Sequence, residues 1–367
     1  MEQSKKRNLA DLNLSKSLRS LFGIVVLALL LWRFYNVLFI EQTYGPDTWA
    51  RFAITGLIIG GMYALIAIGY TLVYGILFMI NFAHGEVMML GSFAGYFVFE
   101  LLAIIPAPFA ANPEKGFLNA LPILSIIIAF LVGMFVSALS GYLLERVAYR
   151  PLRTAPRLVP LISAIGASIF LQNAAMLLFG PQRRPYLNPD WLSRGTGWDV
   201  LIGGRSVLIT YTGVLSIVLS ALLMIGLYLL VQYTKLGRSM RAVAEDKQAA
   251  ALMGIDVNAV ISRTFIISGI LAGAAGVMWG IHNGMINHYI GFLPGMKAFT
   301  AAVMGGIGNI PGAMLGGMTL GILESLGPAM LGIDFQLKDV IAFTILILVL
   351  VFRPSGLLGE RLSEEKV

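Results

Sequence analysis

Long apolar runs separated by short polar segments dominate the pattern of this 367-residue chain. An α-helix of about 20 apolar residues crosses the hydrocarbon core of a membrane, so most of these runs are long enough to form one span each. The runs that we interpret as single spans cover residues 21–40, 52–74, 87–105, 121–144, 158–179, 208–231, 264–281 and 340–352. The pattern therefore predicts an all-α, polytopic integral membrane protein.

Residues 299–331 form a longer apolar stretch that is interrupted in its middle. Seven glycines stand between residues 305 and 321, with Pro311 among them. We interpret this stretch as a hairpin of two short spans that turns at residues 308–311. The hairpin brings the expected number of spans to ten, or to eight if residues 75–86 or 299–331 enter and leave the membrane on the same side.

Glycines recur at four-residue intervals in two of these segments. Gly56 and Gly60 lie in the second predicted span, whereas Gly308, Gly312 and Gly316 lie in the hairpin. Small residues at this spacing let two membrane helices approach each other closely. The hairpin glycines lack the Gly-Lys-Ser or Gly-Lys-Thr ending of a phosphate-binding loop, so we expect no nucleotide cofactor in this chain. If ATP drives the protein, the ATPase is a separate chain that binds ATP-Mg.

Short basic segments indicate the orientation of the spans. Residues 1–20 are basic, the loop at 145–157 holds four arginines, and residues 235–263 hold five lysines and arginines. An excess of such residues marks cytoplasmic loops, and alternation then places the polar loop at 180–206 outside. The run at 21–40 follows basic residues as in a signal peptide, but no small-residue cleavage site follows it, so we expect an uncleaved span.

This orientation puts both termini in the cytoplasm and divides the chain into three parts. Residues 1–45 form an N-terminal extension with one extra span, residues 46–360 form the transmembrane domain, and residues 361–367 form a C-terminal tail. The loop at 235–263 is then a cytoplasmic loop of the transmembrane domain.

Composition agrees with this picture and excludes several functions. The chain is 57% hydrophobic and 12% charged, against about 25% charged residues in a soluble domain. Its net charge of +7 is explained by cytoplasmic loops, and no basic and aromatic patch suggests nucleic acid as a partner. The absence of cysteine excludes disulfides and thiolate chemistry, and three histidines make a histidine-rich metal site unexpected. The lipid bilayer is the partner that composition predicts.

The segment from 235 to 256 is strongly charged although it lies between two apolar runs. Ser239 is suited to cap a helix over Met240–Met253, and Gly254 is suited to end it in the left-handed conformation. Asp256 can then cap the next helix. A short charged helix of this kind is suited to docking in a partner's groove, although a plain solvated connector is the alternative. Our docking candidates are Arg241, Glu245, Asp246 and Gly254.

Polar residues within the apolar runs are candidates for the substrate path. Asn81, His84 and Glu86 follow the second span, and ionisable groups at membrane depth usually face a cavity or a partner. The alternative is that they only orient helix ends at the interface. They supply too few ligands for a zinc site, so we expect no metal there. Glu324 is a candidate ion site of a secondary transporter, or else a hydrogen-bonded residue between helices.

Residues 248–254 resemble the cytoplasmic loop of ABC-importer permeases, in which a Glu-Ala-Ala sequence precedes a glycine by three residues. Gln248 replaces the glutamate, and the usual Ile-x-Leu-Pro sequence downstream is missing. Five further segments resemble the H-type (LivH) permease of the high-affinity branched-chain amino-acid importer, in family order, namely 63–75, 80–86, 145–151, 162–166 and 295–308. The resemblance covers roughly residues 50–360, and the N-terminal extension departs from it.

This resemblance implies a permease subunit in the inner membrane of a bacterium, with leucine, isoleucine and valine as substrates. It implies three kinds of partner, namely a second, M-type permease, two ABC ATPase subunits and a periplasmic substrate-binding protein. The chain itself would be a transport subunit and not an enzyme. Relatives that carry urea or short amides, and an ion-coupled secondary transporter that acts alone, remain the alternatives.

Overall fold

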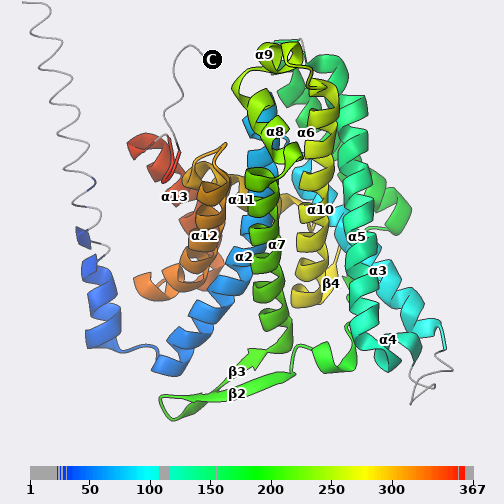
Figure 1. Cartoon of the computed structure of the whole chain (residues 1–367). Coiled ribbons are helices and arrows are strands. Elements are labelled where there is room, and N and C mark those ends of the chain that lie inside the picture. The colour runs from blue at the N-terminus through cyan, green and yellow to red at the C-terminus, as the bar shows by residue number, and fades with distance from the viewer. Residues whose placement is uncertain are drawn as a thin grey trace, which may run out of the picture.

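The chain folds into a bundle of long helices, as the hydropathy pattern predicts (Figure 1). The computed structural model describes residues 23–359 apart from residues 24, 26, 27, 30, 107–115, 154, 157 and 354. In this part of the chain, eight helical segments are long and apolar enough to cross a membrane. They contain α2 (Pro46–Leu77), α3 (His84–Ile104), α5 (Pro122–Leu144), α6 (Leu158–Phe179), α7 (Tyr211–Tyr233), α10 (Val257–Asn283), α12 (Ile310–Leu331) and α13 (Lys338–Phe352). The all-α membrane fold is confirmed.

Two helices form the centre of the bundle, and others present an apolar face outward. α2 and α10 bury most of their length, whereas α6, α7 and α13 bury only a small part of theirs. The exposed residues of these outer helices are predominantly Leu, Ile, Val and Phe, which suits contact with lipid or with another membrane protein. Figure 1 shows α7 in front of α2, with α10 and α5 on one side and α12 and α13 on the other.

Close packing of glycines joins α2 to α12. A Cβ added at Gly321 would lie 2.3 Å from the Cα of Gly60, and one added at Gly317 would lie 2.3 Å from the Cα of Ala64. Gly56 faces the same helix, because a Cβ there would lie 2.9 Å from the Cα of Ile322. The predicted close contact through Gly56 and Gly60 is therefore confirmed, and small residues of α12 supply the other half of the interface.

The glycine-rich stretch forms a helical hairpin of α11 (Phe292–Gly305) and α12. Asn309 caps α12 by accepting a 2.9 Å hydrogen bond from the Gly312 amide, and the turn contains Gly308 at a φ of +95°. Gly312 and Gly316 lie against α11, since a Cβ at either would lie 2.4 Å or less from a backbone oxygen of α11. The packing role predicted for Gly308 is wrong, because nothing lies within 4 Å of a Cβ there, and its positive φ serves the turn instead.

The first arm of this hairpin is shorter than a full span. With 14 residues, α11 is about 21 Å long, whereas the hydrocarbon core of a bilayer is about 30 Å thick. It starts at Phe292, seven residues before the predicted boundary at 299, and follows a non-helical segment after α10. α11 is therefore a half-length helix beside full-length ones.

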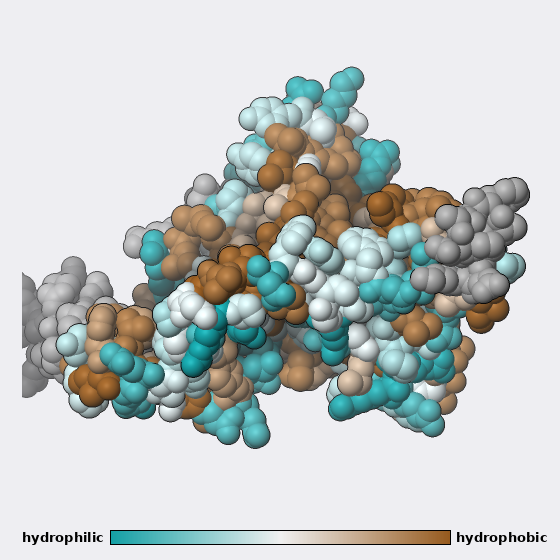
Figure 2. Space-filling view, turned by 90° about the horizontal axis from the view of Figure 1, so that it is seen from below, coloured by the Kyte–Doolittle hydropathy of each residue, from teal (hydrophilic) through white to brown (hydrophobic). Residues whose placement is uncertain are grey.

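The remaining elements lie at the two ends of the bundle. At one end are α8 (Lys235–Glu245) and α9 (Lys247–Leu252), together with the turns that extend α5 over 145–152. At the other end are α4 (Gly116–Ala120) and the antiparallel hairpin of β2 (Gly197–Ile202) and β3 (Arg205–Thr210). Strand β1 (Arg184–Pro185) pairs with β4 (Met285–Ile286) and ties the 180–206 segment to the end of α10. Figure 2 views the molecule from the β2–β3 end and shows hydrophilic residues spread over that face among apolar ones.

The strands within 180–206 were not predicted. Gly203 and Gly204, with φ values of +60° and +81°, form the turn of the β2–β3 hairpin, as expected for a two-residue loop with left-handed residues. The segment nevertheless lies at the opposite end from both basic loops, as alternation of the spans requires.

The described ends of the chain lie side by side. A Cβ added at Gly23 would lie 3.7 Å from the ring of Phe352, at the end of α13. The N-terminal residues 31–35 are helical and continue as a π-helical turn, Asn36–Glu41. With α11 and the eight long segments, this helix brings the number of helices in the bundle roughly into line with the ten spans expected, although the described residues hold eight helices of full span length. The basic residues 1–20 and the tail at 361–367 lie outside the described residues.

Candidate coupling surface and substrate cavities

The charged segment folds differently from the single helix that we predicted. Its first helix, α8, begins after Thr234, whose hydroxyl accepts a 3.1 Å hydrogen bond from the Gly237 amide. The predicted cap at Ser239 is wrong, because this residue lies inside α8 and donates to the Lys235 carbonyl oxygen at 3.1 Å. Thr234 takes the cap because it follows directly on the end of α7, where the chain leaves its helical conformation.

The predicted continuous helix over 240–253 is also wrong, because Asp246 interrupts it. This residue has extended dihedral angles, and its carboxylate accepts hydrogen bonds from the Gln248 and Ala249 amides at 2.7 and 3.0 Å. Asp246 therefore ends α8 and caps α9. The predicted end at Gly254 is confirmed, since its φ is +81° and it follows the last turn of α9. Asp256 caps α10 through the Ala259 amide at 3.0 Å, as predicted.

The four docking candidates lie together on this α8–α9 unit, and two of them have internal roles. The Arg241 guanidinium donates to the carbonyl oxygens of Val231 and Gln232, so it caps the C-terminal end of α7. The Asp246 carboxylate caps the N-terminal end of α9 by accepting from its free amides. Glu245 and Gly254 are both exposed at the surface of the unit.

Sequence reasoning missed the most exposed apolar residues of this end. Leu252 and Met253 close α9 with 89% and 83% of their surface exposed. Large apolar side chains that protrude from a charged surface mark interaction sites. Their position directly before Gly254 was the available signal, since the glycine turn lifts the end of α9 away from the bundle.

Polar contacts connect α9 with the helices of the bundle. Arg153, from the basic loop after α5, forms an ion pair with the buried Glu145 and donates to the Asn258 side chain at the start of α10. The Lys247 ammonium of α9 lies 5.8 Å from the ring centre of Phe78, which follows α2. Burial lowers the pKa of Lys247, and the charge of Arg153 lowers it further. Lys247 therefore places α9 beside the end of α2 and close to Arg153, which is bonded to the start of α10.

Two of the three path candidates form contacts between helices. The Asn81 side-chain oxygen accepts a 2.6 Å hydrogen bond from the Tyr149 hydroxyl, and both residues are buried. His84 lies 3.3 Å from the Ser268 hydroxyl through its Nδ1, while its Nε2 packs against Gly69. Within the described residues, no group of three histidine, aspartate or glutamate side chains could hold a metal ion. Neither Asn81 nor His84 lines a cavity that we describe below.

Glu86 is the candidate that faces a cavity. The cavity measures about 290 Å³ and lies between α3, α6 and the start of α11. Gln172 and Ser168 of α6 donate to Oε1 of Glu86, at 2.6 and 3.3 Å. We call this space the Glu86 cavity.

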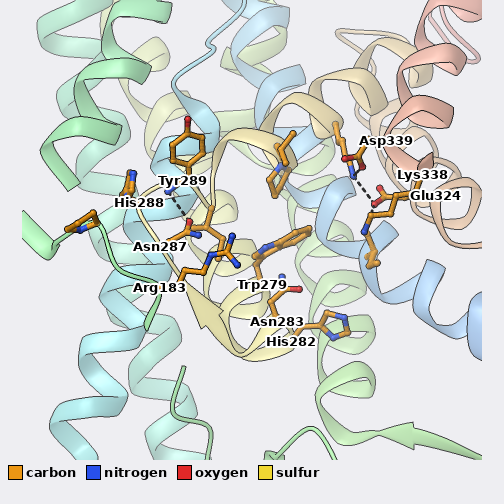
Figure 3. Close-up of a pocket in the computed structure, with 16 residues that line it drawn as sticks. Arg183, Trp279, His282, Asn283, Asn287, His288, Tyr289, Glu324, Lys338 and Asp339 are labelled. Atoms are coloured by element: carbon orange, nitrogen blue, oxygen red, sulfur yellow. Dashed lines mark hydrogen bonds and ion pairs between the residues drawn. The ribbon is translucent and has the colours of Figure 1, made fainter. Parts of the chain in front are cut away.

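A second cavity of about 550 Å³ opens on the other side of α11 (Figure 3). Figure 3 shows Glu324, Lys338 and Asp339 on one side of it, and imidazole, amide and guanidinium groups on the other. The polar residues on that opposite side are Arg183, His282, Asn283, Asn287 and His288. We call this space the polar cavity.

The charged side of the polar cavity is an ion-pair network around the buried Lys297 and Glu324. Lys297 of α11 donates to Oε1 of Glu324 at 2.7 Å and also contacts Asp339 at 2.5 Å. The Tyr63 hydroxyl donates to the second oxygen of Glu324 at 2.9 Å, and the Lys338 ammonium lies 3.6 Å from the first. Glu324 is thus held by partners within the protein, as expected of a hydrogen-bonded residue between helices. The sequence analysis did not single out Lys297.

The comparison with known families identifies the kind of protein. A model of the family described as branched-chain amino acid transport system / permease component matches residues 52–350. The chain belongs to this permease family. Membership favours a transport subunit over a carrier that acts alone and over an enzyme.

Individual relatives agree over nearly their whole length. The chain is 48% identical over 316 residues to the high-affinity branched-chain amino acid transport system permease protein BraD of Pseudomonas aeruginosa, covering 86% of this chain and 96% of the relative. It is 44% identical to the corresponding protein LivH of Escherichia coli, with 85% and 96% covered. A probable permease protein LivH of Methanocaldococcus jannaschii is 30% identical, with 83% and 90% covered. No solved structure matches the chain.

Proposed function

We propose that this permease is one subunit of an ATP-driven importer that carries leucine, isoleucine and valine across the bacterial inner membrane. The observation that carries the proposal is the 48% identity, over 86% of the chain, to a permease named for high-affinity branched-chain amino acid transport. Urea and short amides are weaker candidates, because the named relatives at high identity are amino acid permeases.

The importer would contain a second, M-type permease, two ATPase subunits and a periplasmic substrate-binding protein. The sequence lacks a phosphate-binding loop, so ATP-Mg would bind to the separate ATPases. The outer faces of α6, α7 and α13 offer the surface on which a second permease can pack. The α8–α9 unit offers the ATPase-binding surface, with Leu252 and Met253 as its apolar contacts.

Coupling would follow from how tightly the α8–α9 unit is attached. Arg241 ties α8 to the end of α7, and Lys247 places α9 against the end of α2. Closure of the ATPases on ATP would displace α9, and these contacts would pass the displacement to the helices that line the cavities. The membrane part would then alternate between outward-facing and inward-facing states, with the energy supplied by the partner subunits.

The proposal is tested with the whole importer in proteoliposomes, with ATP inside and leucine-loaded binding protein outside. We expect uptake of radiolabelled leucine that depends on ATP and on the binding protein, and that excess isoleucine or valine reduces but urea does not. The importer proposal is wrong if the purified complex contains no ATPase. If excess urea or acetamide reduced leucine uptake and excess isoleucine did not, the substrate would be urea or a short amide.

Docking is tested with two changes at the α9 end. Leu252→Ser together with Met253→Ser should reduce both ATPase co-purification and uptake, because these side chains are the most exposed apolar ones of that surface. Leu201→Ser is the matched control, since Leu201 is 77% exposed in the β2–β3 hairpin at the opposite end. Equal retention of the ATPase by both variants would show that Leu252 and Met253 do not contact it.

A further inference from the structure

The Glu86 carboxylate has one oxygen without a partner. Oε1 receives the hydrogen bonds from Gln172 and Ser168, whereas Oε2 receives none from the described residues and is buried. Glu86 as a whole is only 1% exposed. A buried charged group without a donor is costly, and a carboxylate can accept at both of its oxygens. This oxygen is therefore free to accept a hydrogen bond from a group outside the described residues.

No positive charge of the described residues lines the Glu86 cavity. Apart from Glu86, its wall consists of uncharged residues from α2, α3, α6 and α11 and their connections. The large apolar side chains among them are Phe82, Ile165, Ile169, Phe292 and Met296. The contrast with the polar cavity is direct, because Lys297 and Lys338 neutralise Glu324 there. A cation that enters the Glu86 cavity meets one carboxylate and apolar walls, with no basic side chain of the described residues beside it.

The start of α11 lies directly beside this carboxylate. Gly291 precedes the helix, and a Cβ there would lie 2.2 Å from the Gly85 carbonyl oxygen and 3.1 Å from Oε2 of Glu86. α11 has 14 residues, and no side chain caps its first turn. The N-terminal end of such a helix attracts negative charge, and half-length membrane helices often present this end to a substrate. The cavity thus combines a carboxylate, a helix N-terminus and apolar walls.

The size and the opening of the cavity suit a small ligand in transit. Its volume of about 290 Å³ is at the lower end of the range for small-molecule pockets. Ile165, Ile169 and Phe292 line it and are 44%, 54% and 44% exposed, so it opens toward the outside of the bundle along α6. In the proposed importer, the second permease would cover this opening.

We infer that the Glu86 cavity binds the amino acid during its passage, with the α-ammonium group on Oε2 of Glu86. The substrate carboxylate then faces the first turn of α11, and the branched side chain lies against Ile165, Ile169 and Met296. This assignment rests on the proposed function, since it takes an α-amino acid as the substrate. It makes Glu86 a binding residue for the ammonium group.

Glu86→Gln is the sharpest test, because glutamine preserves the shape of the side chain. Its amide oxygen can still accept from Gln172 and Ser168, whereas the NH₂ group that replaces Oε2 repels an ammonium donor. The whole importer is assayed in proteoliposomes for leucine uptake and for ATPase activity stimulated by the binding protein. We expect uptake to fall by about tenfold or more, as for loss of one charged hydrogen bond. ATPase stimulation should stay within about twofold, since the α8–α9 unit is untouched.

Glu100→Gln is the matched control, because Glu100 lies on the same helix, α3, and is bonded by Tyr96 at 2.7 Å outside the cavity. Its uptake should equal that of the unmodified importer. Equal uptake by the Glu86 and Glu100 variants would overturn the inference and leave the proposed function intact. If the unmodified importer carries no leucine, it is the proposed function that fails.

A second pair of variants decides the question if Glu86→Gln fails to assemble. Ile169→Lys brings an ammonium group into the cavity on a tether, where it can occupy Oε2 of Glu86, and Ile169→Met is an uncharged change of similar length. We expect leucine uptake by the lysine variant to be about tenfold or more lower than uptake by the methionine variant. Equal uptake by the two variants would contradict an ammonium site at Glu86.

Discussion

A single added methyl group at Gly321 should push α2 and α12 apart. A Cβ at this position would lie 2.3 Å from both the Cα and the nitrogen of Gly60, and 2.7 Å from the Gly56 carbonyl oxygen. Carbon atoms in contact are about 3.5–4.0 Å apart, so Gly321→Ala requires the two helices to separate by about 1 Å or more. All three atoms belong to the backbone of α2, so no side-chain rotation can relieve the overlap.

The expected cost follows from two opposing effects. Overpacking of a tight interface costs about 1–3 kcal/mol, whereas alanine in a helix is favoured over glycine by up to about 1 kcal/mol. Gly226→Ala on α7 isolates the second effect, because nothing lies within 4 Å of a Cβ at Gly226. We expect Gly321→Ala to lower the free energy of unfolding by about 1–2 kcal/mol and Gly226→Ala to leave it unchanged or raise it slightly.

The assay is thermal denaturation of the detergent-purified permease, followed by the loss of its peak in size-exclusion chromatography. The melting temperature of the Gly321 variant should fall below that of the unmodified permease, while that of the Gly226 variant should not. A Gly321→Ala protein that melts at the same temperature as the Gly226 variant would refute the close backbone contact on which this reasoning depends.

Three other substitutions test contacts of the bundle. Lys297→Met leaves the buried Glu324 without its nearest cation, so this substitution should destabilise the protein by about 3–5 kcal/mol. Adding Glu324→Gln to this variant should restore at least half of the loss in melting temperature. Asp246→Ala removes the cap of α9, so it should lower the stability of the protein by about 1 kcal/mol and should reduce ATPase stimulation. Asp246→Asn should largely preserve ATPase stimulation, because asparagine is also a good N-cap. Tyr149→Phe leaves the buried Asn81 oxygen without its donor and should lower stability by about 1–3 kcal/mol, measured by the same melting assay.

The spans were predictable because a membrane makes helix formation a local requirement. Every backbone polar group in lipid must be satisfied within its own segment, so an apolar run of sufficient length is enough to predict a helix. The predicted span at 158–179 coincides with α6, and the predicted run at 52–74 lies within α2, which covers Pro46–Leu77. The hairpin of β2 and β3 was harder to predict, since each strand has only six residues and the pairing depends on the turn at Gly203 and Gly204.

The breaks of the charged segment were not predictable from capping preference alone. Thr234, Ser239 and Asp246 are all suitable N-caps, and propensity does not rank them reliably. Packing against the end of α7 decides between them, because Arg241 fixes α8 to that end while the chain turns at Thr234. The carboxylate of Asp246 then finds two free amides of α9, and the helix restarts there.

The partners of the polar residues depend on contacts between distant parts of the chain. Gln172, which interrupts the fifth predicted span, bonds Glu86 across 86 residues of sequence, whereas its neighbour Asn173 bonds the Ile169 carbonyl of its own helix. Lys297 reaches Glu324 across 27 residues, from α11 to α12. The sequence thus indicated Glu86 and Glu324 as unusual for a membrane span but not Lys297, and only the packing of the helices shows the partners of each.

The two buried carboxylates on either side of α11 differ in what the protein provides for them. Glu324 has a lysine within 2.7 Å and a tyrosine hydroxyl on its other oxygen, so its charge is compensated in the folded chain itself. Glu86 has uncharged donors on one oxygen, and the described residues provide none for the other. Removing the charge of Glu324 should therefore reduce stability more than uptake, whereas removing the charge of Glu86 should reduce uptake more than stability. Measuring both quantities on Glu324→Gln and Glu86→Gln tests this difference directly, and a loss of uptake without loss of stability at Glu324 would reverse the roles assigned to the two cavities.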